Sequence, residues 1–305
     1  MNVSPSSRNI GRYGTGFIVA LLLSAFALSL TAAGPQETDL TFTHKERSLQ
    51  PGEVVLLEAR SSRPLKQLRI RAFRHVFPAY SEDGGVSWAG LVGIDLATKP
   101  GSYRVTLDGA GADGRRVTTH DELVVKAKKF PTRVLTVDPK YVTPPADVLD
   151  RINEERARVD GIFASTTPER LWSGPFVLPV PGKVISAFGK RSVYNGQPRS
   201  PHRGTDFRGA EGTPIQAPNE GRVVLASNLY YTGNTVILDH GLGLYSYFGH
   251  MSVLSVEEGA LIHTGEIVGK VGATGLVTGP HLHWTVCLAG IRVDPLSLVD
   301  ILTNP

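Results

Sequence analysis

Two short stretches of the sequence contain the residue types of a metal centre. The first, Pro201-His-Arg-Gly-Thr-Asp206, places His202 and Asp206 four positions apart, and the second, Gly279-Pro-His-Leu-His-Trp284, adds His281 and His283. A catalytic zinc is held by three such groups, with water in its fourth position. If the two stretches meet in space, four candidates compete for three places. One group is then left to act on substrate.

The second stretch reads as a β-strand. Leu282, Trp284 and Val286 alternate with polar or titratable residues, which is the period of a strand with one apolar face. Residues two apart on a strand project to the same side, so His281 and His283 are expected on one face. One can then bind a metal while the other faces substrate.

The beginning of the chain predicts export. Arg8 and Arg12 precede an apolar run at 17–30, and small residues follow at 31–34. This is the order of a signal peptide, and the run is shorter than the roughly 20 apolar residues of a spanning helix. We expect residues 1–33 to be a signal peptide, with an uncleaved membrane anchor as the alternative. Either one predicts a periplasmic or extracellular protein.

The rest of the chain is expected to be mainly β and to contain two modules. Its single cysteine, Cys287, excludes an intrachain disulfide. Residues 36–138 alternate short β runs with turn signals, which is typical of a β-sandwich-like module. Residues 176–305 are rich in glycine and short β runs with almost no helical periodicity, which predicts an all-β domain. The strands expected in the two modules are 54–57, 68–73, 103–107 and 122–125, then 184–188, 221–225, 235–238, 244–248 and 267–271.

A linker at 139–175 is expected to join the two modules. Pro144 and Pro145 suit the start of a short helix, apolar residues then recur at near-helical spacing, and Gly161 can end it. The proline-rich stretch 165–181 is a linker or an entry strand. It could also lie across the active groove.

The motifs of the last module resemble those of the lysostaphin-like (LytM, M23) zinc endopeptidases over about residues 180–300. The ordered combination is more specific than any one piece. The pieces are Gly189-Lys-Arg191, His202-Arg-Gly-Thr-Asp206, Gly212-Thr-Pro214, Gly221, Thr235-Val-Ile-Leu-Asp-His-Gly241, Tyr247-Phe-Gly-His-Met251, Gly272-Ala-Thr-Gly275 and Thr278-Gly-Pro-His-Leu-His283.

The resemblance implies an all-β lysostaphin-like domain with one Zn²⁺ per chain. It assigns His202, Asp206 and His283 as zinc ligands, and His281 and His250 as the catalytic pair that does not bind the metal. Peptide hydrolysis needs an activated water, a proton acceptor and a group that stabilises the oxyanion. We expect His281 to be the base and His250 to hydrogen-bond the tetrahedral intermediate, although the two roles could be exchanged.

Other residues near these motifs have simpler interpretations. Tyr247 either packs against the sheet or forms part of a substrate-binding wall. His240, between Asp239 and Gly241, is expected in a turn. Cys287 would lie about 13 Å along the strand from His283, which is too far for a thiol peptidase. The sequence contains neither the His-Glu-x-x-His of a zincin nor a Gly-x-Ser-x-Gly elbow.

The charge is unevenly distributed along the chain. The net charge is +4, and residues 41–140 contain 17 Lys and Arg against 11 Asp and Glu, whereas residues 182–305 contain 9 of each. The first module could therefore contact an anionic wall polymer or a membrane surface, although an ordinary solvated basic face is the simpler interpretation. No compact basic block contains interleaved aromatic residues, so nucleic acid is not expected as a partner.

Two functional hypotheses follow from these features. The first is an exported zinc endopeptidase that cuts cross-links or stem peptides of peptidoglycan. The second is a catalytically silent wall-binding or regulatory module on the same fold. The presence of all five site residues favours the enzyme, and the peptide bond that it would cut is not specified by the sequence.

Overall fold

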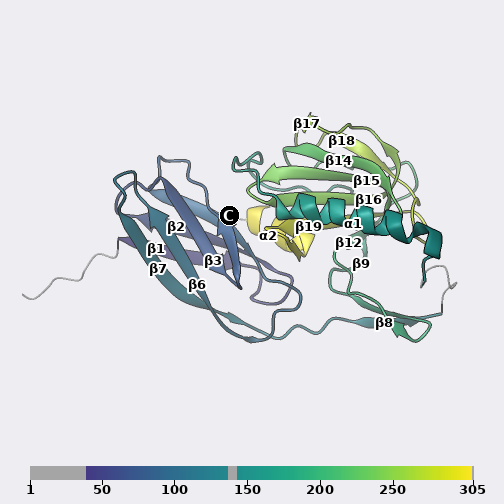
Figure 1. Ribbon diagram of the computed structural model, residues 1–305, viewed down its shortest axis with the longest axis horizontal. Coiled ribbons are helices and arrows are strands. Elements are labelled where there is room, and N and C mark those ends of the chain that lie inside the picture. The colour runs from purple at the N-terminus through teal and green to yellow at the C-terminus, as the bar shows by residue number, and fades with distance from the viewer. Residues whose placement is uncertain (1–38, 137–142, 304–305) are drawn as a thin grey trace, which may run out of the picture. The chain divides into compact units, whose positions relative to one another are not determined.

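The computed structural model describes residues 39–136 and 143–303 (Figure 1). The expected signal peptide at 1–33 lies outside the described residues. Within them, the chain is mainly β with two α-helices, which confirms the expected fold class. No helix in these two ranges is long and apolar enough to cross a membrane.

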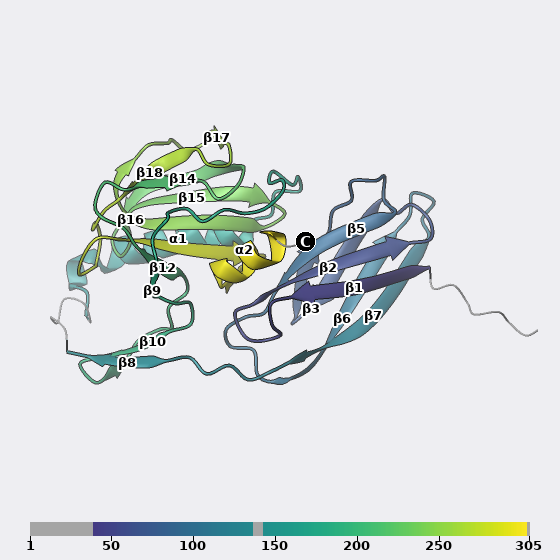
Figure 2. The same ribbon diagram turned by 180° about the vertical axis from the view of Figure 1, so that it is seen from behind.

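The first module consists of two antiparallel sheets, with strand orders β1-β2-β5 and β4-β3-β6-β7 (Figure 2). Their strands are β1 (Leu40–Glu46), β2 (Val54–Ser61), β3 (Gln67–Ala72), β4 (His75–Pro78), β5 (Ser87–Gly93), β6 (Gly101–Ala110) and β7 (Arg116–Val125). In β3, apolar side chains are buried and the arginines between them are exposed, as expected of a half-buried strand. At Gly90 in β5, an added Cβ would lie 2.4 Å from Cδ1 of Ile70 in β3, so the glycine permits close packing here.

The connection between the modules contains a strand and a helix. β8 (Thr132–Leu135) pairs in parallel with β10 (Arg191–Tyr194), which also pairs with β11 (Gln197–Pro198). The short 3-10 turn η2 (Ala146–Val148) then leads into α1 (Leu149–Ala164), close to the predicted helix. β8 was not expected, because its partner strand lies far away in the sequence.

The second module is built on a ten-stranded sheet whose main path is β17-β14-β15-β16-β19-β12-β9. Its strands are β9 (Val184–Ser186), β12 (Thr205–Arg208), β13 (Pro214–Gln216), β14 (Gly221–Leu229), β15 (Gly233–Gly241), β16 (Leu244–Leu254), β17 (Leu261–Ile262), β18 (Ile267–Val271), β19 (His281–Leu288) and β20 (Ile291–Val293). α1 lies across one face of this sheet, where Phe163 packs with Tyr245, Tyr247 and Cys287 (Figure 1).

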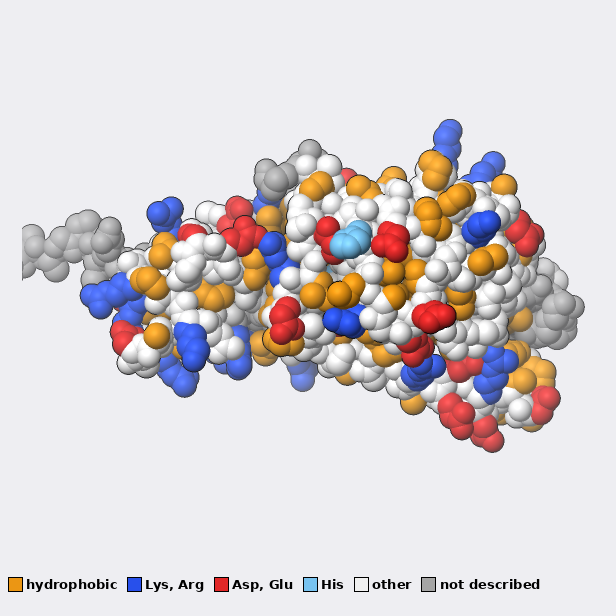
Figure 3. Space-filling model, turned by 90° about the horizontal axis from the view of Figure 1, so that it is seen from above, with side chains coloured by type: hydrophobic (Ala, Val, Ile, Leu, Met, Phe, Trp, Pro, Cys, Tyr) orange, Lys and Arg blue, Asp and Glu red, His pale blue; other side chains and the backbone are white. Residues whose placement is uncertain are grey.

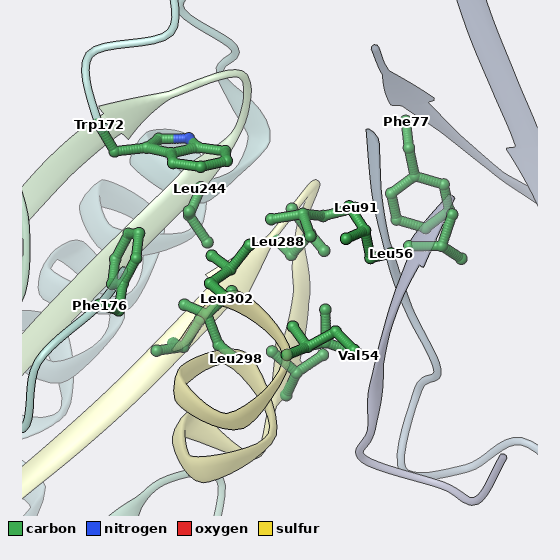
Figure 4. Close-up of a cluster of buried hydrophobic side chains, with 14 of the residues drawn as sticks. Val54, Leu56, Phe77, Leu91, Trp172, Phe176, Leu244, Leu288, Leu298 and Leu302 are labelled. Carbon is green, nitrogen blue, oxygen red and sulfur yellow. The ribbon is translucent and has the colours of Figure 1, made fainter. Parts of the chain in front are cut away.

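A second helix, α2 (Pro295–Thr303), ends the described chain and was not expected in an all-β domain. Leu298 and Leu302 of α2 belong to the same buried apolar cluster as Val54 and Leu56 of β2 (Figure 4). The backbone N–H of Val54 donates to Ser297 Oγ at 2.9 Å. The helix therefore supplies core side chains that the first module also uses.

Candidate metal centre and active site

Three side chains of the types that bind metals converge where β12 and β19 pair. Asp206 and His283 lie directly opposite each other in this antiparallel pair, so their side chains share one face of the sheet. Nδ1 of His283 lies 2.8 Å from Oδ1 of Asp206 and 3.1 Å from Nε2 of His202, and that Nε2 lies 3.0 Å from Oδ1. The two stretches that are distant in sequence therefore meet.

Hydrogen bonds to the second nitrogens orient both imidazoles. Nδ1 of His202 faces the carbonyl oxygen of Ala187 at 3.1 Å, and because a carbonyl only accepts, Nδ1 carries the hydrogen. Nε2 of His283 donates to Thr285 Oγ1 at 2.9 Å, and that hydroxyl donates to the carbonyl of Arg203 at 3.1 Å. Each histidine therefore turns its other ring nitrogen toward Asp206.

The donor set fits a small divalent metal. Two imidazole nitrogens and a carboxylate oxygen are zinc ligands, and with bonds of roughly 2.0–2.1 Å the donors of a tetrahedral site lie about 3.3 Å apart. The observed separations of 2.8–3.1 Å require outward shifts of only a few tenths of an ångström. His202, Asp206 and His283 therefore form a group that could hold a metal ion.

The electrostatics of the triad agree with metal binding. Burial disfavours the charge of Asp206, but its interactions with His202 and His283 outweigh this and hold the pKa of the carboxyl well below its usual range. Burial also lowers the pKa of His283, against the opposing effect of Asp206. An ionised carboxylate beside a neutral imidazole is the protonation state that a metal requires.

The other two predicted histidines form a pair beside the triad. The ring centroids of His250 and His281 are 4.8 Å apart, and Nε2 of His281 lies 3.9 Å from Oδ1 of Asp206. Each donates its Nδ1–H to a carbonyl, His281 to Gly279 at 2.9 Å and His250 to Thr274 at 3.0 Å. In both rings Nε2 is therefore the acceptor nitrogen.

His250 is held under tighter constraint than His281. Its φ of +65° is in the left-handed region, which costs energy for a residue with a Cβ, and its N–H donates to the carbonyl of Thr232 at 2.6 Å. Burial, followed by the electrostatic effect of His283, lowers the pKa of His250 to about 3. His250 is therefore neutral at ordinary pH.

The structure places the remaining sequence candidates outside the groove. Tyr247 is buried beneath the triad, with its ring 6.2 Å from that of His283 and its hydroxyl bonded to Thr232, which favours packing. His240 lies inside β15 and not in a turn, bonded to Glu220 O at 2.6 Å and Ser246 Oγ at 2.9 Å. Burial raises the pKa of Cys287 to about 12, so its thiol stays protonated.

A groove of about 390 Å³ contains all five predicted metal and catalytic residues. Its other walls come from β8, β10 and the loops around Thr232 and Thr278, none of which the sequence assigned to the site. The alternation along the sequence of β19 predicted that Thr285 shares a face with the histidines. It did not predict that Thr285 orients His283. A larger hollow of about 850 Å³, lined in part by Phe42, Trp88 and Trp172, contains none of the five residues.

An antiparallel sheet that carries a His–Asp–His triad with two neighbouring imidazoles is the arrangement of a metallopeptidase domain. The description Peptidase family M23 matches residues 200–295. The crystal structure of a Pseudomonas aeruginosa protein assigned to peptidase M23 is 31% identical and superposes with a TM-score of 0.65 over 83% of this chain and 95% of that one. The chain belongs to peptidase family M23, which confirms the resemblance seen in its motifs.

Curated relatives match a shorter part of the chain. Peptidoglycan DD-endopeptidase ShyA of Vibrio cholerae is 36% identical over 116 residues, which are 38% of this chain and 27% of that protein. DD-carboxypeptidase/endopeptidase Mpg of Neisseria meningitidis is 36% identical over 97 residues, 32% of this chain and 22% of that protein. The chain spans about a quarter of the length of the curated relatives that it matches.

Proposed function

We propose that this protein is an exported zinc endopeptidase that hydrolyses peptide bonds in the cross-links or stem peptides of peptidoglycan. The observation that carries the proposal is the convergence of His202, Asp206 and His283 to within 3.1 Å of one another, with two further histidines in the same groove. One relative named as a peptidoglycan DD-endopeptidase and another named as a DD-carboxypeptidase/endopeptidase support the substrate class.

His202, Asp206 and His283 would hold the zinc, each oriented by the contacts described above. The chemistry that bound zinc supplies is a water with a pKa near 7 and polarisation of the scissile carbonyl. Thr285 and the carbonyl of Ala187 keep the two imidazoles in the tautomers that present their lone pairs. These residues therefore fix the position at which the water would give its proton to the base.

His281 acts as the general base in this proposal. Its Nδ1–H is bonded to Gly279 O, so Nε2 is available to accept a proton from the nucleophilic water. A pKa of about 3 makes His250 a poor base at neutral pH, so His281 is the better candidate. The proton then passes from His281 to the amine that leaves.

His250 stabilises the developing oxyanion in this proposal. Its Nδ1–H is already bonded to Thr274 O, so Nε2 must gain a proton before it can donate to an oxyanion. The ring of His281 lies 4.8 Å away, so the one proton taken from the water can pass to His250 while the oxyanion exists and return through His281 to the amine that leaves. Exchange of the two roles would require His250 to accept the first proton despite its low pKa.

Export belongs to the proposal because peptidoglycan lies outside the cytoplasmic membrane. The charged and apolar segments before residue 34 support a signal peptide or an anchor. Fractionation of cells that produce the full chain should place it in the periplasm or the medium, or in the membrane fraction if the segment is retained. A cytoplasmic protein would contradict this part of the proposal.

Binding of an anionic polymer or membrane surface by the first module stays a prediction. On the face of the molecule that Figure 3 shows, Lys and Arg side chains are interspersed with acidic ones. Several basic residues of the first module form ion pairs, such as Arg71 with Asp108 at 2.6 Å and Lys128 with Glu53 at 2.7 Å. This pairing reduces the charge that is available to a polymer.

A chelator-reversible cleavage assay tests the proposed function. The full chain is incubated with purified peptidoglycan, and the released fragments are identified by mass spectrometry. We expect cleavage to stop with a zinc chelator and to return when Zn²⁺ is added. Wall binding without cleavage, unaffected by the chelator, would instead support a silent binding module.

A further inference from the structure

One wall of the groove comes from β8, a strand that lies outside the part of the chain matched to family M23. Arg133 and Leu135 of β8 line the groove with the metal ligands. Val134, between them, is 73% exposed and belongs to the opposite side of the strand, as strand alternation requires. The segment that connects the two modules therefore contributes an arginine to the site.

The side chain of Arg133 is held in place by β10. Its Nε donates to Ser192 Oγ and its Nη2 to the hydroxyl of Tyr194, both at 3.1 Å. These bonds use two of the five guanidinium N–H donors, and both partners are neutral. The guanidinium is thus oriented while its charge is not compensated by these partners.

The same segment is connected to the metal centre. β10 follows residues 187–190, where Ala187 O accepts from His202 Nδ1 and Lys190 O accepts from the His202 backbone N–H at 2.9 Å. The position of Arg133 is therefore fixed relative to His202 through one short stretch of hydrogen-bonded chain. An arginine held in this way can bind a substrate group near the bond that is cut.

The charges of the groove favour an anionic ligand. Among the described residues that line it, Asp206 is the one acidic residue, and its charge would be used by the metal. Arg133 and Arg199 are the basic residues of the same lining. A guanidinium fork binds a carboxylate through two parallel hydrogen bonds and distinguishes it from a neutral amide.

From these observations we infer that Arg133 is a specificity-determining residue that binds a substrate carboxylate next to the scissile amide. The inference rests on the proposed function and specifies its substrate. The bond should be of the form acyl–NH–CH(COO⁻), in which the carboxylate is on the carbon that bears the amide nitrogen. A D-alanyl cross-link to a diamino acid with a free carboxylate has this form, as does a terminal D-Ala-D-Ala. A glycyl bridge or a cross-link to the side chain of lysine does not.

The test compares three synthetic substrates for the full zinc-loaded chain. The first is a D-alanyl cross-link to diaminopimelic acid with its carboxylate free, the second has that carboxylate amidated, and the third is a monomeric stem ending in D-Ala-D-Ala. We expect kcat/KM for the free carboxylate to exceed that for its amide by about 10- to 100-fold, the range for a charge-assisted bond. The relative rates on the first and third substrates identify which source of the carboxylate is used.

The variant Arg133→Gln should remove this preference. Its kcat/KM should fall on the free carboxylate and stay near the wild-type value on the amide, while Arg133→Lys restores part of the preference. Arg104→Gln, an exposed change in β6, serves as a matched control and should retain full discrimination. Zinc content and circular dichroism of each variant establish that the site and fold are intact.

Two outcomes would overturn the inference while leaving the proposed function in place. One is equal cleavage of the acid and its amide by the wild-type chain. The other is an equal loss on both substrates in Arg133→Gln with zinc still bound. If the zinc-loaded wild-type chain cut none of the substrates and no purified peptidoglycan, the proposed function itself would fail.

Discussion

The five histidine and aspartate side chains of the groove differ in what their ring nitrogens and carboxylate oxygens face, and this difference matches the proposed division between metal ligands and catalytic groups. In the triad, two ring nitrogens and a carboxylate oxygen face one another within 3.1 Å. In the pair formed by His250 and His281, the acceptor nitrogens are not in mutual contact, and each ring is oriented by a backbone carbonyl. Residue type alone does not make this distinction.

Single substitutions should separate the two roles. His283→Ala should lose both bound zinc and activity, because it removes a donor. His281→Ala should keep zinc but lose activity by about 10²- to 10⁴-fold, the usual contribution of a general base. Zinc content by elemental analysis, together with kcat/KM on purified peptidoglycan fragments, checks both expectations.

His263→Ala, a change of an exposed histidine, provides the control for these variants and should leave zinc and activity unchanged. A metal-free His281→Ala protein would show that the division between ligand and base is wrong.

Thr285 should strengthen zinc binding without touching the metal. Thr285→Val removes the hydroxyl that accepts from His283 Nε2–H and donates to Arg203 O, so the imidazole loses its orienting partner. We expect zinc affinity to fall by about 10- to 100-fold, measured by competition with a chromophoric chelator. Thr285→Ser should retain most of the affinity. Equal affinities for the valine variant and the wild type would contradict this role.

At the scale of the elements, the paired strands β12 and β19 position the triad. Gly204, directly before β12, has no side chain and lets the backbone approach β19 closely. An added Cβ at this position would lie 2.6 Å from His283 Cε1, 2.6 Å from Thr285 Oγ1 and 2.7 Å from the backbone oxygen of Trp284. The oxygen belongs to the sheet and cannot move away easily. A side chain here would displace His283.

Gly204→Ala should therefore weaken zinc binding, as measured by equilibrium dialysis against Zn²⁺. The matched control is Gly161→Ala in α1, where an added Cβ meets nothing within 4 Å. That change should leave zinc binding intact and stabilise the protein by about 0.5–1 kcal/mol, because alanine suits a helix better than glycine. Normal zinc affinity in Gly204→Ala would contradict the steric argument.

β15 contains a buried histidine whose protonation should destabilise the fold in acid. Burial lowers the pKa of His240 to about 4, against an ordinary value of 6.5. Between these two values the unfolded chain binds a proton that the folded chain does not, so the free energy of unfolding falls as the pH drops from about 6.5 to about 4. The contribution of this residue is on the order of 3 kcal/mol.

Urea unfolding between pH 8 and pH 4 tests this expectation. His240→Asn keeps an N–H donor near Glu220 O but cannot be protonated in this range, so its stability should depend less on pH than that of the wild type. The variant should be less stable at pH 8, because it loses the bond to Ser246. Parallel pH profiles for the two proteins would show that His240 has no part in acid sensitivity.

The sequence predicted the elements whose pattern is local and missed those that depend on distant partners. The strand expected at 267–271 is observed with those bounds, and the alternation along β19 placed His281 and His283 on the correct strand. β8 consists of four exposed residues and is defined by pairing with β10, which no local pattern reveals. α2 was missed because its nine residues are mostly apolar and span too few turns for a helical period to be recognised.

The same distinction applies to the site. Spacing and family motifs identified the five side chains that could bind metal or move protons. The orienting groups were not identified, because carbonyls such as those of Ala187 and Thr274 are present in every residue and only the fold selects them. His240 was expected in a turn because Asp and Gly flank it, but burial of its ring in the sheet decides its place.

On the scale of the whole molecule, the core joins side chains from both modules. Leu298 is fully buried in α2, within the cluster that contains Val54 of β2. Leu298→Ala should destabilise the protein by about 2–5 kcal/mol, as a cavity in a packed core does. Hydrogen exchange should become faster in α2 and also at the Val54 amide, which donates to Ser297.

Leu149→Ala, at a position that is 44% exposed, is the control and should change exchange little. Faster exchange in α2 with an unchanged rate at Val54 would show that β2 does not depend on this helix.

The parallel pairing of β8 with β10 also bears on how such proteins can be recombined. Arg133 and Leu135 line the groove but lie well before residues 200–295, which match the family domain. A chimera made by exchanging only that domain between relatives would contain the triad but not the wall of the groove that β8 supplies. Substitutions in the segment that contains β8 could therefore change substrate specificity without altering the triad, His250 or His281.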